Sequence, residues 1–449
     1  MKDKNIYKTI IIANGAEAFE NVLSKIDNEK EKKRRIFLEH NLSGRALFWE
    51  SDNKVIITPY PVQNSLINKS TEFGFSNIKN LAPSKIDISL SRAIMANSNL
   101  WNSIIKIIKN NPGIKISPYS VTEEFLILVE NLKKKNLDFS VNEKPELNSE
   151  WTISYLDSKV GFRTEMLKVQ SFLREEIIPE GFICKDKKEA ASIAKWFYKN
   201  KRPCVIKVNY GESGWGLIIA ERKNFSSSLD LEKKLKKRLN SDLIWNDTLI
   251  IVEEFIKPNI KTGRGSPSIE IFVDDSGFKI TYGCGQLLVN QREFIGVIMG
   301  KGFLDTDKNS KLHKISSAIG KRYWELGYRG FFDIDFVVSS QGKPYTIETN
   351  MRRTGGTHVF DIAKTIFGQK WKEAYFISQD SFKYGNKILP DDVLLDKMSR
   401  ILYPIKNEKR GVILTIIDRW ASTFGFVIVA ATSEEAKSIY SKLLNLWRK

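Results

Sequence analysis

The chain has few cysteines and no long apolar run. Cys184, Cys204 and Cys284 are an odd number at wide spacing, and none forms a CxxC pair. This pattern argues against a secreted disulfide framework and favours a reducing compartment. No apolar stretch is long enough to span a bilayer, and too few apolar residues follow the charged N-terminus to make a signal sequence. We therefore expect a cytoplasmic protein with no membrane partner.

Histidine is also scarce. The chain contains only His40, His313 and His358, and these do not belong to any credible catalytic triad. His358 fits a structural histidine better than a substrate contact. Chemistry that depends on a nucleophilic side chain activated by histidine is therefore not indicated.

Basic residues outnumber acidic ones, which favours anionic partners in general. The chain has 71 Lys and Arg against 53 Asp and Glu, a formal net charge of +18. The excess is scattered, and its densest runs, 29–35 and 233–238, alternate with acids or apolar residues as solvated helix faces do. No zinc-finger spacing, RNP-type segment or basic stripe with interleaved aromatics is present. We expect no nucleic-acid partner.

The length of 449 residues indicates two or three packed domains. An apolar strand at 9–13 runs into a small-residue turn and a helical pattern at 16–26, which predicts a Rossmann-like α/β unit. Further predicted elements are strands at 45–49, 54–58, 411–417 and 425–431, and helices at 100–109, 187–199, 229–239, 309–326 and 433–447. A polar cluster at 142–150 indicates the first domain boundary.

A β-hairpin with acidic residues is predicted near residue 340. The segment 331–338 reads as a strand, 339–342 as a turn, and 343–348 as the returning strand. Asp335 and Glu348 can then face each other, and Asn350 follows on the same face as Glu348. Carboxylate and amide oxygens suit Mg²⁺, which proteins share with substrate phosphates, although a solvated acidic edge is the alternative. Arg352 and Arg353 follow with forked donors suited to phosphate or carboxylate.

A second group of residues indicates phosphate binding. Lys207 lies in a short buried strand that leads into a glycine-rich loop and a further strand at 217–220. The lysine supplies a point charge, and glycines let backbone N–H groups approach an anion. The loop consists of Gly211, Glu212, Ser213, Gly214, Trp215 and Gly216, and it matches neither a Walker A nor a GxGxxG pattern.

A third segment could seat a purine. The apolar strand at 249–256 ends in Glu253, Glu254, Phe255 and Ile256. Aliphatic side chains there could sandwich a base while a carboxylate and backbone groups read its amino group. Taken singly, the two glutamates are also explained by solvation of a strand end.

The order of these parts resembles the ATP-grasp superfamily over residues 155–375. The resemblance implies that ATP, with Mg²⁺, lies between two α+β subdomains and that the glycine loop covers its phosphates. It assigns Lys207 to the α-phosphate and adenine side, with Lys168 as its companion lysine. It assigns the adenine hinge to Glu253, Glu254 and Ile256, and the magnesium site to Asp335, Glu348 and Asn350.

One position departs from that pattern. The family usually carries a ribose-binding glutamate shortly after the hinge, whereas this chain has no acid there before Glu270. Glu270 is therefore a candidate for the ribose or for the substrate side. The runs 348–358 and 211–216 are most similar to peptide ligases of the pheganomycin type, which join a carboxylate to the amino group of a peptide or amino acid.

The resemblance implies a mixed α/β and α+β chain of three parts. These are a Rossmann-like pre-ATP-grasp domain at 1–148, an ATP-grasp domain at 149–375 and a small α+β C-terminal extension at 376–449. The ATP-grasp domain divides into a first subdomain at 184–256, with the glycine loop, and a second at 257–375, with the metal site. A homodimer is an open option.

The implied reaction is ADP-forming ligation of small molecules. The γ-phosphoryl group of ATP would pass to a substrate carboxylate, and an amine or peptide would attack the acylphosphate. Arg353 is the preferred arginine for stabilising that transfer, Arg352 is nearly as good, and either could instead bind the substrate carboxylate. Weaker candidates for that carboxylate are Arg163 and Arg292. A kinase that stops after phosphoryl transfer and a non-catalytic ATP-binding scaffold are the alternatives.

Overall fold

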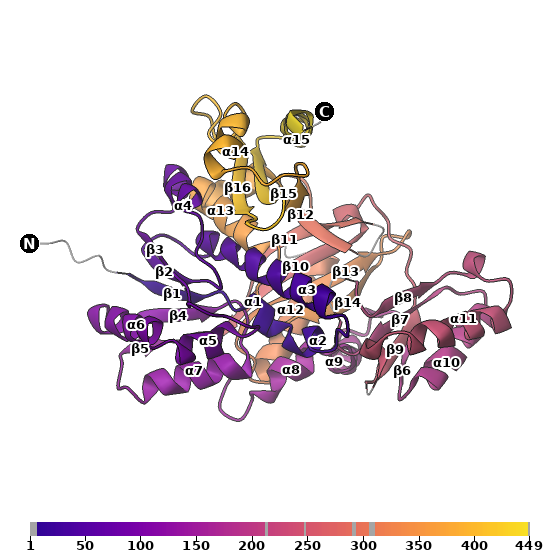
Figure 1. The fold of residues 1–449 in the computed structure, drawn as a ribbon. Helices are drawn as coiled ribbons and strands as arrows, with labels where there is room; N and C mark the ends of the chain where they lie inside the picture. Colours follow the sequence, from indigo (N-terminus) through magenta and orange to yellow (C-terminus); the bar gives the residue numbers. More distant parts are fainter. Residues whose placement is uncertain (1–6, 212–213, 247, 290–292, 305–309, 448–449) are drawn as a thin grey trace, which may run out of the picture.

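The computed structural model describes residues 7–211, 214–246, 248–289, 293–304 and 310–447 (Figure 1). Its strands form three sheets that follow one another along the chain. Glu212, Ser213 and Arg292 lie outside the described residues. Among the described helices, none combines the length and apolar character needed to cross a membrane.

The first sheet is parallel and has five strands in the order β3-β2-β1-β4-β5. Ile10 and Ile12 of β1 pack with one set of helices, whereas Ile11 between them belongs to the core shared with the third sheet. The strands are β1 (Thr9–Ile12), β2 (Lys54–Ile57), β3 (Ile78–Leu81), β4 (Ile114–Pro118) and β5 (Phe139–Ser140). The main helices are α3 (Glu29–Leu42), α5 (Leu90–Ala96), α6 (Ser98–Asn110) and α7 (Glu123–Lys133).

Two predictions in this region are wrong. The segment predicted as a strand at 45–49 forms the 3₁₀ helix η1 (Ser43–Phe48), which directly follows α3. A short buried apolar run has no periodicity to separate strand from helix, and only its packing decides. The helix predicted at 16–26 is broken at Phe19 into α1 (Gly15–Ala18) and α2 (Glu20–Leu23), because Phe19 has a non-helical backbone.

The second sheet has four antiparallel strands in the order β6-β9-β7-β8. Helices α10 (Lys187–Lys199) and α11 (Ser228–Asn240) match the predicted ones and pack on it through a shared apolar core. Its strands are β6 (Gly181–Cys184), β7 (Cys204–Val208), β8 (Leu217–Ala220) and β9 (Ile250–Glu254). Figure 1 shows this unit at one side of the molecule.

The third sheet has eight strands in the order β14-β13-β10-β11-β12-β15-β17-β16. The C-terminal strands therefore extend the same sheet that carries the acidic hairpin, with β15 and β17 paired antiparallel. The strands are β10 (Pro267–Asp274), β11 (Gly277–Val289), β12 (Glu293–Gly300), β13 (Gly330–Val338), β14 (Pro344–Asn350), β15 (Tyr375–Lys383), β16 (Gly411–Ile417) and β17 (Thr423–Ala430). The helices are α12 (Lys311–Glu325), α13 (Thr357–Phe367), α14 (Asp391–Met398) and α15 (Ser433–Trp447).

Candidate functional site

The predicted acidic hairpin is present as β13 and β14. Asp335 pairs directly with Glu348, and Asp333 pairs with Asn350. A β-bulge after Asp335 keeps these polar residues together at the end of the pair. The register confirms the prediction that Asp335 and Glu348 face each other. Asp333 was not predicted, although it precedes Asp335 by two residues and therefore lies on the same face.

These acids are crowded and buried. Asp335 accepts hydrogen bonds from Gln286 Nε2 at 2.6 Å and Asn350 Nδ2 at 3.2 Å, and Asn350 Nδ2 also donates to Asp333 at 2.8 Å. Burial raises the pKa of Asp335 well above its usual value, and the carboxylates of Asp333 and Glu348 raise it further. Burial also raises the pKa of Asp333, to about 6. Ionising both aspartates together is therefore unfavourable at this site.

Lys207 connects the second sheet to this hairpin. Its ammonium donates to the backbone oxygen of Ile347 in β14 at 3.3 Å and pairs with Glu253 at 2.5 Å. The β7–β9 register explains the ion pair, because Glu253 lies opposite Val205, two residues from Lys207 on the same face. Arg163 also pairs with Glu253, at 3.3 Å. Lys207 thus stands where the two sheets meet.

A second lysine, Lys159, lies closest to the acids and was not predicted. Its ammonium pairs with Glu348 at 2.9 Å, and its backbone N–H donates to Asn209 O at 3.0 Å. Burial favours the neutral form of Glu348, but Lys159 and Lys207 outweigh it and lower its pKa. Lys159 opens helix α9 (Lys159–Leu173), whose N-cap is Ser158. A serine N-cap is a local signal that could have indicated this helix start.

Lys168, the predicted companion of Lys207, lies elsewhere on the same helix. Its side chain is 55% exposed and pairs with Glu165 at 2.8 Å. Lys168 is nine residues after Lys159, or two and a half turns, so the two side chains lie on opposite faces of α9. The structure does not bring Lys168 to the acids.

The end of β9 shows how the predicted hinge is held. Glu254 alternates with Glu253 and points to the other side of the sheet, where it pairs with Arg202. The backbone N–H of Phe255 donates to Pro203 O at 3.0 Å, and Phe255 and Ile256 are both partly buried. Both glutamate side chains are therefore engaged in ion pairs. The part of the predicted hinge that is not engaged in this way is the backbone beyond β9.

The glycine loop connects β7 and β8 and reaches the N-terminal domain. The N–H of Val208 donates to Gly216 O at 2.9 Å, which closes the loop. Gly216 has a φ of 76°, and a Cβ at Gly211 would lie 2.6 Å from Trp215 O, so both positions require glycine. The Trp215 ring lies 5.4 Å from the Arg35 guanidinium of α3. Gly214 completes the described part of the loop.

The two predicted arginines point in different directions. Arg352 donates to Asn350 Oδ1 at 2.8 Å and to Asp157 Oδ1 at 3.1 Å, and it lies 4.6 Å from the Phe19 ring centroid. Arg353, the preferred arginine, is instead 1% exposed and pairs with Glu143 of the N-terminal domain at 2.7 Å. Successive residues of an extended chain project to opposite sides. Arg352 therefore joins the acidic group and Arg353 does not.

Glu270 lies beneath the loop that carries these arginines. Its carboxylate accepts hydrogen bonds from Thr357 Oγ1 at 2.6 Å and Tyr282 OH at 3.0 Å. Burial raises the pKa of Glu270 to about 7. A Cβ at Gly356 would lie 2.5 Å from Tyr282 OH, so the loop packs tightly on this network. His358, the second residue of α13, is also buried, and burial lowers its pKa well below the usual value.

The acidic hairpin supplies oxygen donors for a divalent cation, but one of them faces away from the acids. Asp335, Glu348 and Asn350 supply oxygen donors, which suits magnesium. However, Asn350 turns its Nδ2 to the acids and its Oδ1 to Arg352. Within the described part of the chain, no group of three or more His, Cys, Asp or Glu residues is arranged to hold a metal ion. Binding would require the Asn350 amide to turn over.

Comparison with known proteins gives a fold. No family model matches the chain, and no curated protein matches it. Phosphoribosylamine–glycine ligase from Thermotoga maritima is 16% identical and has a TM-score of 0.53, with 97% of this chain and 96% of that chain covered. Biotin carboxylase from Campylobacter jejuni, solved with a β,γ-ATP ligand, is 15% identical with a TM-score of 0.53, covering 97% and 90%.

A third solved structure extends the likeness over the whole chain. N5-carboxyaminoimidazole synthase from Aspergillus clavatus, solved with ADP and 5-aminoimidazole ribonucleotide, is 10% identical with a TM-score of 0.52, covering 99% of this chain and 100% of that chain. These proteins are ligases of the ATP-grasp superfamily. At such identities the likeness shows the fold alone, and it confirms that this chain has the ATP-grasp fold, here with one parallel and two antiparallel sheets.

Proposed function

We propose that the protein is an ATP-dependent, ADP-forming carboxylate–amine ligase. The observation that carries the proposal is the meeting of two cations with the acidic hairpin. Lys207 reaches β14 from the second sheet, and Lys159 pairs with Glu348 at 2.9 Å. Solved structures with this fold contain ADP or ATP, and one of them contains MgADP. The phosphates of a nucleotide bound between the sheets would replace the protein carboxylates as partners of these two lysines.

The nucleotide would use residues from both sheets. Lys207 and Lys159 are the cations for its phosphates, and they are held in place by Glu253 and Glu348 until phosphate replaces those partners. The backbone after β9 and the apolar side chains of Phe255 and Ile256 would hold the adenine. Gly211, Gly214 and Gly216 leave the loop backbone open to the phosphates, and Trp215 against Arg35 anchors the loop to the N-terminal domain.

Asp335, Glu348 and Asn350 are the proposed magnesium ligands. The fit rests on the oxygen donors and their charge. Burial, and after it the carboxylates of Asp333 and Glu348, raises the pKa of Asp335, and a divalent cation would relieve the repulsion among these carboxylates. When bound, the metal ion would neutralise phosphate charge during transfer. Gln286, which donates to Asp335 at 2.6 Å, would have to move aside.

The proposed chemistry has two steps. A substrate carboxylate oxygen attacks the γ-phosphorus of ATP, and the bond to the β-phosphate oxygen breaks to release ADP. The amine then attacks the acylphosphate carbon, so an amide bond forms, phosphate leaves and the amine loses a proton. We assign the binding of the carboxylate or of the developing charge to Arg352, and the support is its hydrogen bond to Asn350.

For the substrates, we propose an amino acid or small carboxylic acid joined to an amino acid or peptide. The support is the run 348–358, in which Arg352, Arg353 and paired glycines follow the proposed metal ligands as in pheganomycin-type peptide ligases. Gly355 and Gly356 pack on Phe294 and Tyr282, leaving no room for a side chain. A cytoplasmic location, the absence of a nucleic-acid partner and a homodimer remain predictions.

The test combines product mass with nucleotide analysis. Purified protein is incubated with ATP, Mg²⁺ and a mixed pool of amino acids and short peptides. We expect ADP and phosphate to form only when a carboxylate and an amine are both present. The mass of the product should equal the summed masses of the two substrates minus that of water. AMP with pyrophosphate would overturn the proposal in favour of adenylation. A stable phosphorylated product without condensation would favour the kinase, and nucleotide binding without turnover would favour the scaffold.

A further inference from the structure

Helix α3 of the N-terminal domain lies along the candidate site and presents one carboxylate to it, that of Glu39. Figure 1 shows α3 crossing the middle of the molecule. Arg35 contacts Trp215 of the glycine loop, with 5.4 Å between the guanidinium and the ring centroid. Glu39 follows Arg35 by four residues, so the two side chains lie on the same face of α3. Glu39 is therefore turned toward the ATP-grasp part of the chain.

Three guanidinium groups lie near Glu39, but each is paired with another acid. The pairs are Arg35 with Glu31 at 2.9 Å, Arg45 with Asp380 at 2.8 Å and Arg352 with Asp157 at 3.1 Å. Glu39 is only partly buried, and within the described chain its carboxylate makes no hydrogen bond or ion pair. It is thus a carboxylate that solvent can reach and that lacks a cation of its own.

The surroundings of Glu39 disfavour its charged form. Burial raises its pKa to about 7, the guanidiniums of Arg45 and Arg352 oppose this rise, and the carboxylate of Asp380 adds to it. A carboxylate with such a pKa can hold a cation and can also accept a proton near pH 7. The missing partner is therefore a cation that can give up a proton, which describes an ammonium group.

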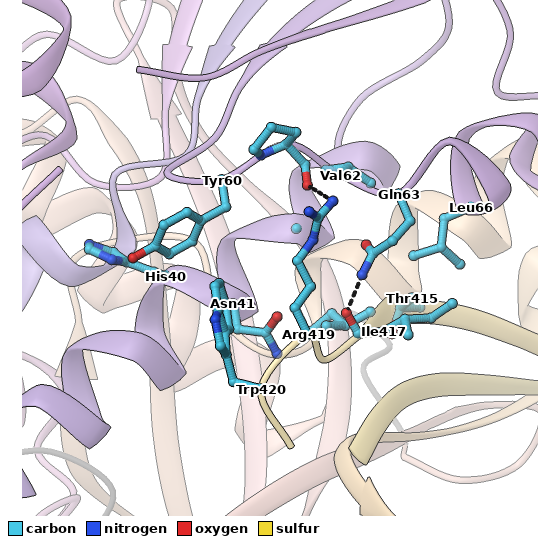
Figure 2. A pocket seen from close by; sticks show the side chains of 13 residues that line it. His40, Asn41, Tyr60, Val62, Gln63, Leu66, Thr415, Ile417, Arg419 and Trp420 are labelled. Atoms are coloured by element: carbon cyan, nitrogen blue, oxygen red, sulfur yellow. Dashed lines mark hydrogen bonds between the residues drawn. The ribbon is translucent and has the colours of Figure 1, made fainter. Parts of the chain in front are cut away.

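The next two residues of α3 turn away from this face. His40 and Asn41 line a small cavity between α3 and β16, shown in Figure 2. That cavity has room for about one water molecule. A substrate that reaches α3 therefore meets the face that carries Glu39.

Glu39 also lies beside the loop that carries Arg352. The charge of Arg352 acts on Glu39 directly. A Cβ at Gly355 would lie 3.6 Å from Asp380 Oδ2, so the pair of Arg45 and Asp380 packs against the same loop. An amine bound at Glu39 would therefore be beside a carboxylate bound at Arg352.

We propose that Glu39 binds the ammonium group of the amine substrate and accepts its proton, an assignment that rests on the proposed ligase function. One proton passes from the ammonium nitrogen to the Glu39 carboxylate, and the neutral amine attacks the acylphosphate carbon. The carbon–nitrogen bond forms, the bond from that carbon to the phosphate oxygen breaks, and the second proton leaves with the phosphate. Because Glu39 is partly exposed, it returns its proton to water. The substrate class is an amine that is cationic at pH 7, such as the amino group of an amino acid or peptide.

Hydroxylamine separates this role from the first step of the reaction. It is uncharged near pH 7 and converts acylphosphates into hydroxamates without needing a base. Each protein is incubated with ATP, Mg²⁺ and a mixed pool of amino acids and short peptides, with and without hydroxylamine, and amides and hydroxamates are measured by mass spectrometry. Affinity for a non-hydrolysable ATP analogue is measured separately by titration calorimetry.

Glu39→Gln keeps the shape of the side chain and removes its charge. Amide formation should fall by at least about 100-fold, because the amine loses both its partner and its base. Hydroxamate formation and affinity for the ATP analogue should stay near the wild-type level, which also shows that the variant is folded. Glu39→Asp should recover part of the amide formation. Glu29→Gln, at an exposed acid in the first turn of α3, is the matched control and should behave as wild type does.

The outcomes distinguish this assignment from the ligase function itself. If Glu39→Gln lowered amide and hydroxamate formation equally, Glu39 would act on the first step or on the structure, and the assignment would be wrong. Unchanged amide formation in this variant would also overturn it. If the wild type formed neither ADP nor hydroxamate with any member of the pool, the ligase function would be refuted, and the role of Glu39 with it.

Discussion

Replacing Arg353 with leucine should destabilise the contact between the N-terminal domain and the rest of the chain. The Arg353 guanidinium pairs with Glu143 at 2.7 Å and Glu50 at 3.2 Å, and it also donates to Ser117 Oγ at 2.8 Å. It lies 4.1 Å from the ring centroid of Phe331. Leucine would fill part of this volume but would remove the charge and every donor.

The magnitude follows from the charge that is left behind. The Glu143 side chain is 2% exposed, so it would stay buried without its cation. Removing one partner of a buried ion pair costs about 3–5 kcal/mol. With an unfolding entropy of about 2.1 cal/mol/K per residue, the 449-residue chain loses about 1 °C of Tm per kcal/mol if it unfolds as one unit. The expected decrease in Tm is therefore about 3–5 °C.

Scanning calorimetry of the wild type, Arg353→Leu and the double variant Arg353→Leu/Glu143→Leu measures this effect. The double variant should recover part of the loss, because it removes the unpaired charge. Arg352→Leu is the matched control. Its partner Asp157 is 33% exposed and can be solvated, so this variant should lose turnover with a smaller change in Tm. If Arg353→Leu kept the wild-type Tm and lost turnover, Arg353 would act on the reactants and the reasoning would be refuted.

Three further predictions concern the site and a buried lysine. Glu348→Gln should lower kcat for ADP release by roughly 100-fold with the fold intact; near-normal turnover at saturating Mg²⁺ would exclude Glu348 as a metal ligand. Lys207→Ala should weaken binding of a non-hydrolysable ATP analogue at least about tenfold by titration calorimetry, whereas exposed Lys168→Ala should not; the reverse pattern would exchange their roles. Burial lowers the pKa of Lys54 from 10.5 to about 7. Between pH 7 and 10.5 the unfolded chain therefore keeps a proton on Lys54 that the folded chain has lost, so the free energy of unfolding should rise with pH over this range. Lys54→Met should remove that part of the pH dependence of Tm. An unchanged pH dependence in the variant would contradict this assignment.

Local sequence patterns predicted the elements that depend on residues close together in the chain. The hairpin of β13 and β14 was predicted because alternation, turn residues and alternation follow one another within some twenty residues. Its register then places Asp335 opposite Glu348. Helix α10 was predicted with its correct bounds, because helical periodicity is also a local signal; the structure adds that Asp186 caps it. The buried segment at 43–48 has no such period, and packing made it a 3₁₀ helix.

The hairpin, the lysine strand and the glycine loop follow from the amino-acid sequence, because backbone alternation and turn chemistry act between neighbours in the chain. Which charges meet depends instead on how distant elements pack. It placed Lys159 rather than Lys168 beside Glu348, and it turned Arg353 into the N-terminal domain while leaving Arg352 at Asn350. The physical reason is that a buried charge needs a partner, and the partners of these residues come from elements far away in the sequence, whose positions no local pattern encodes.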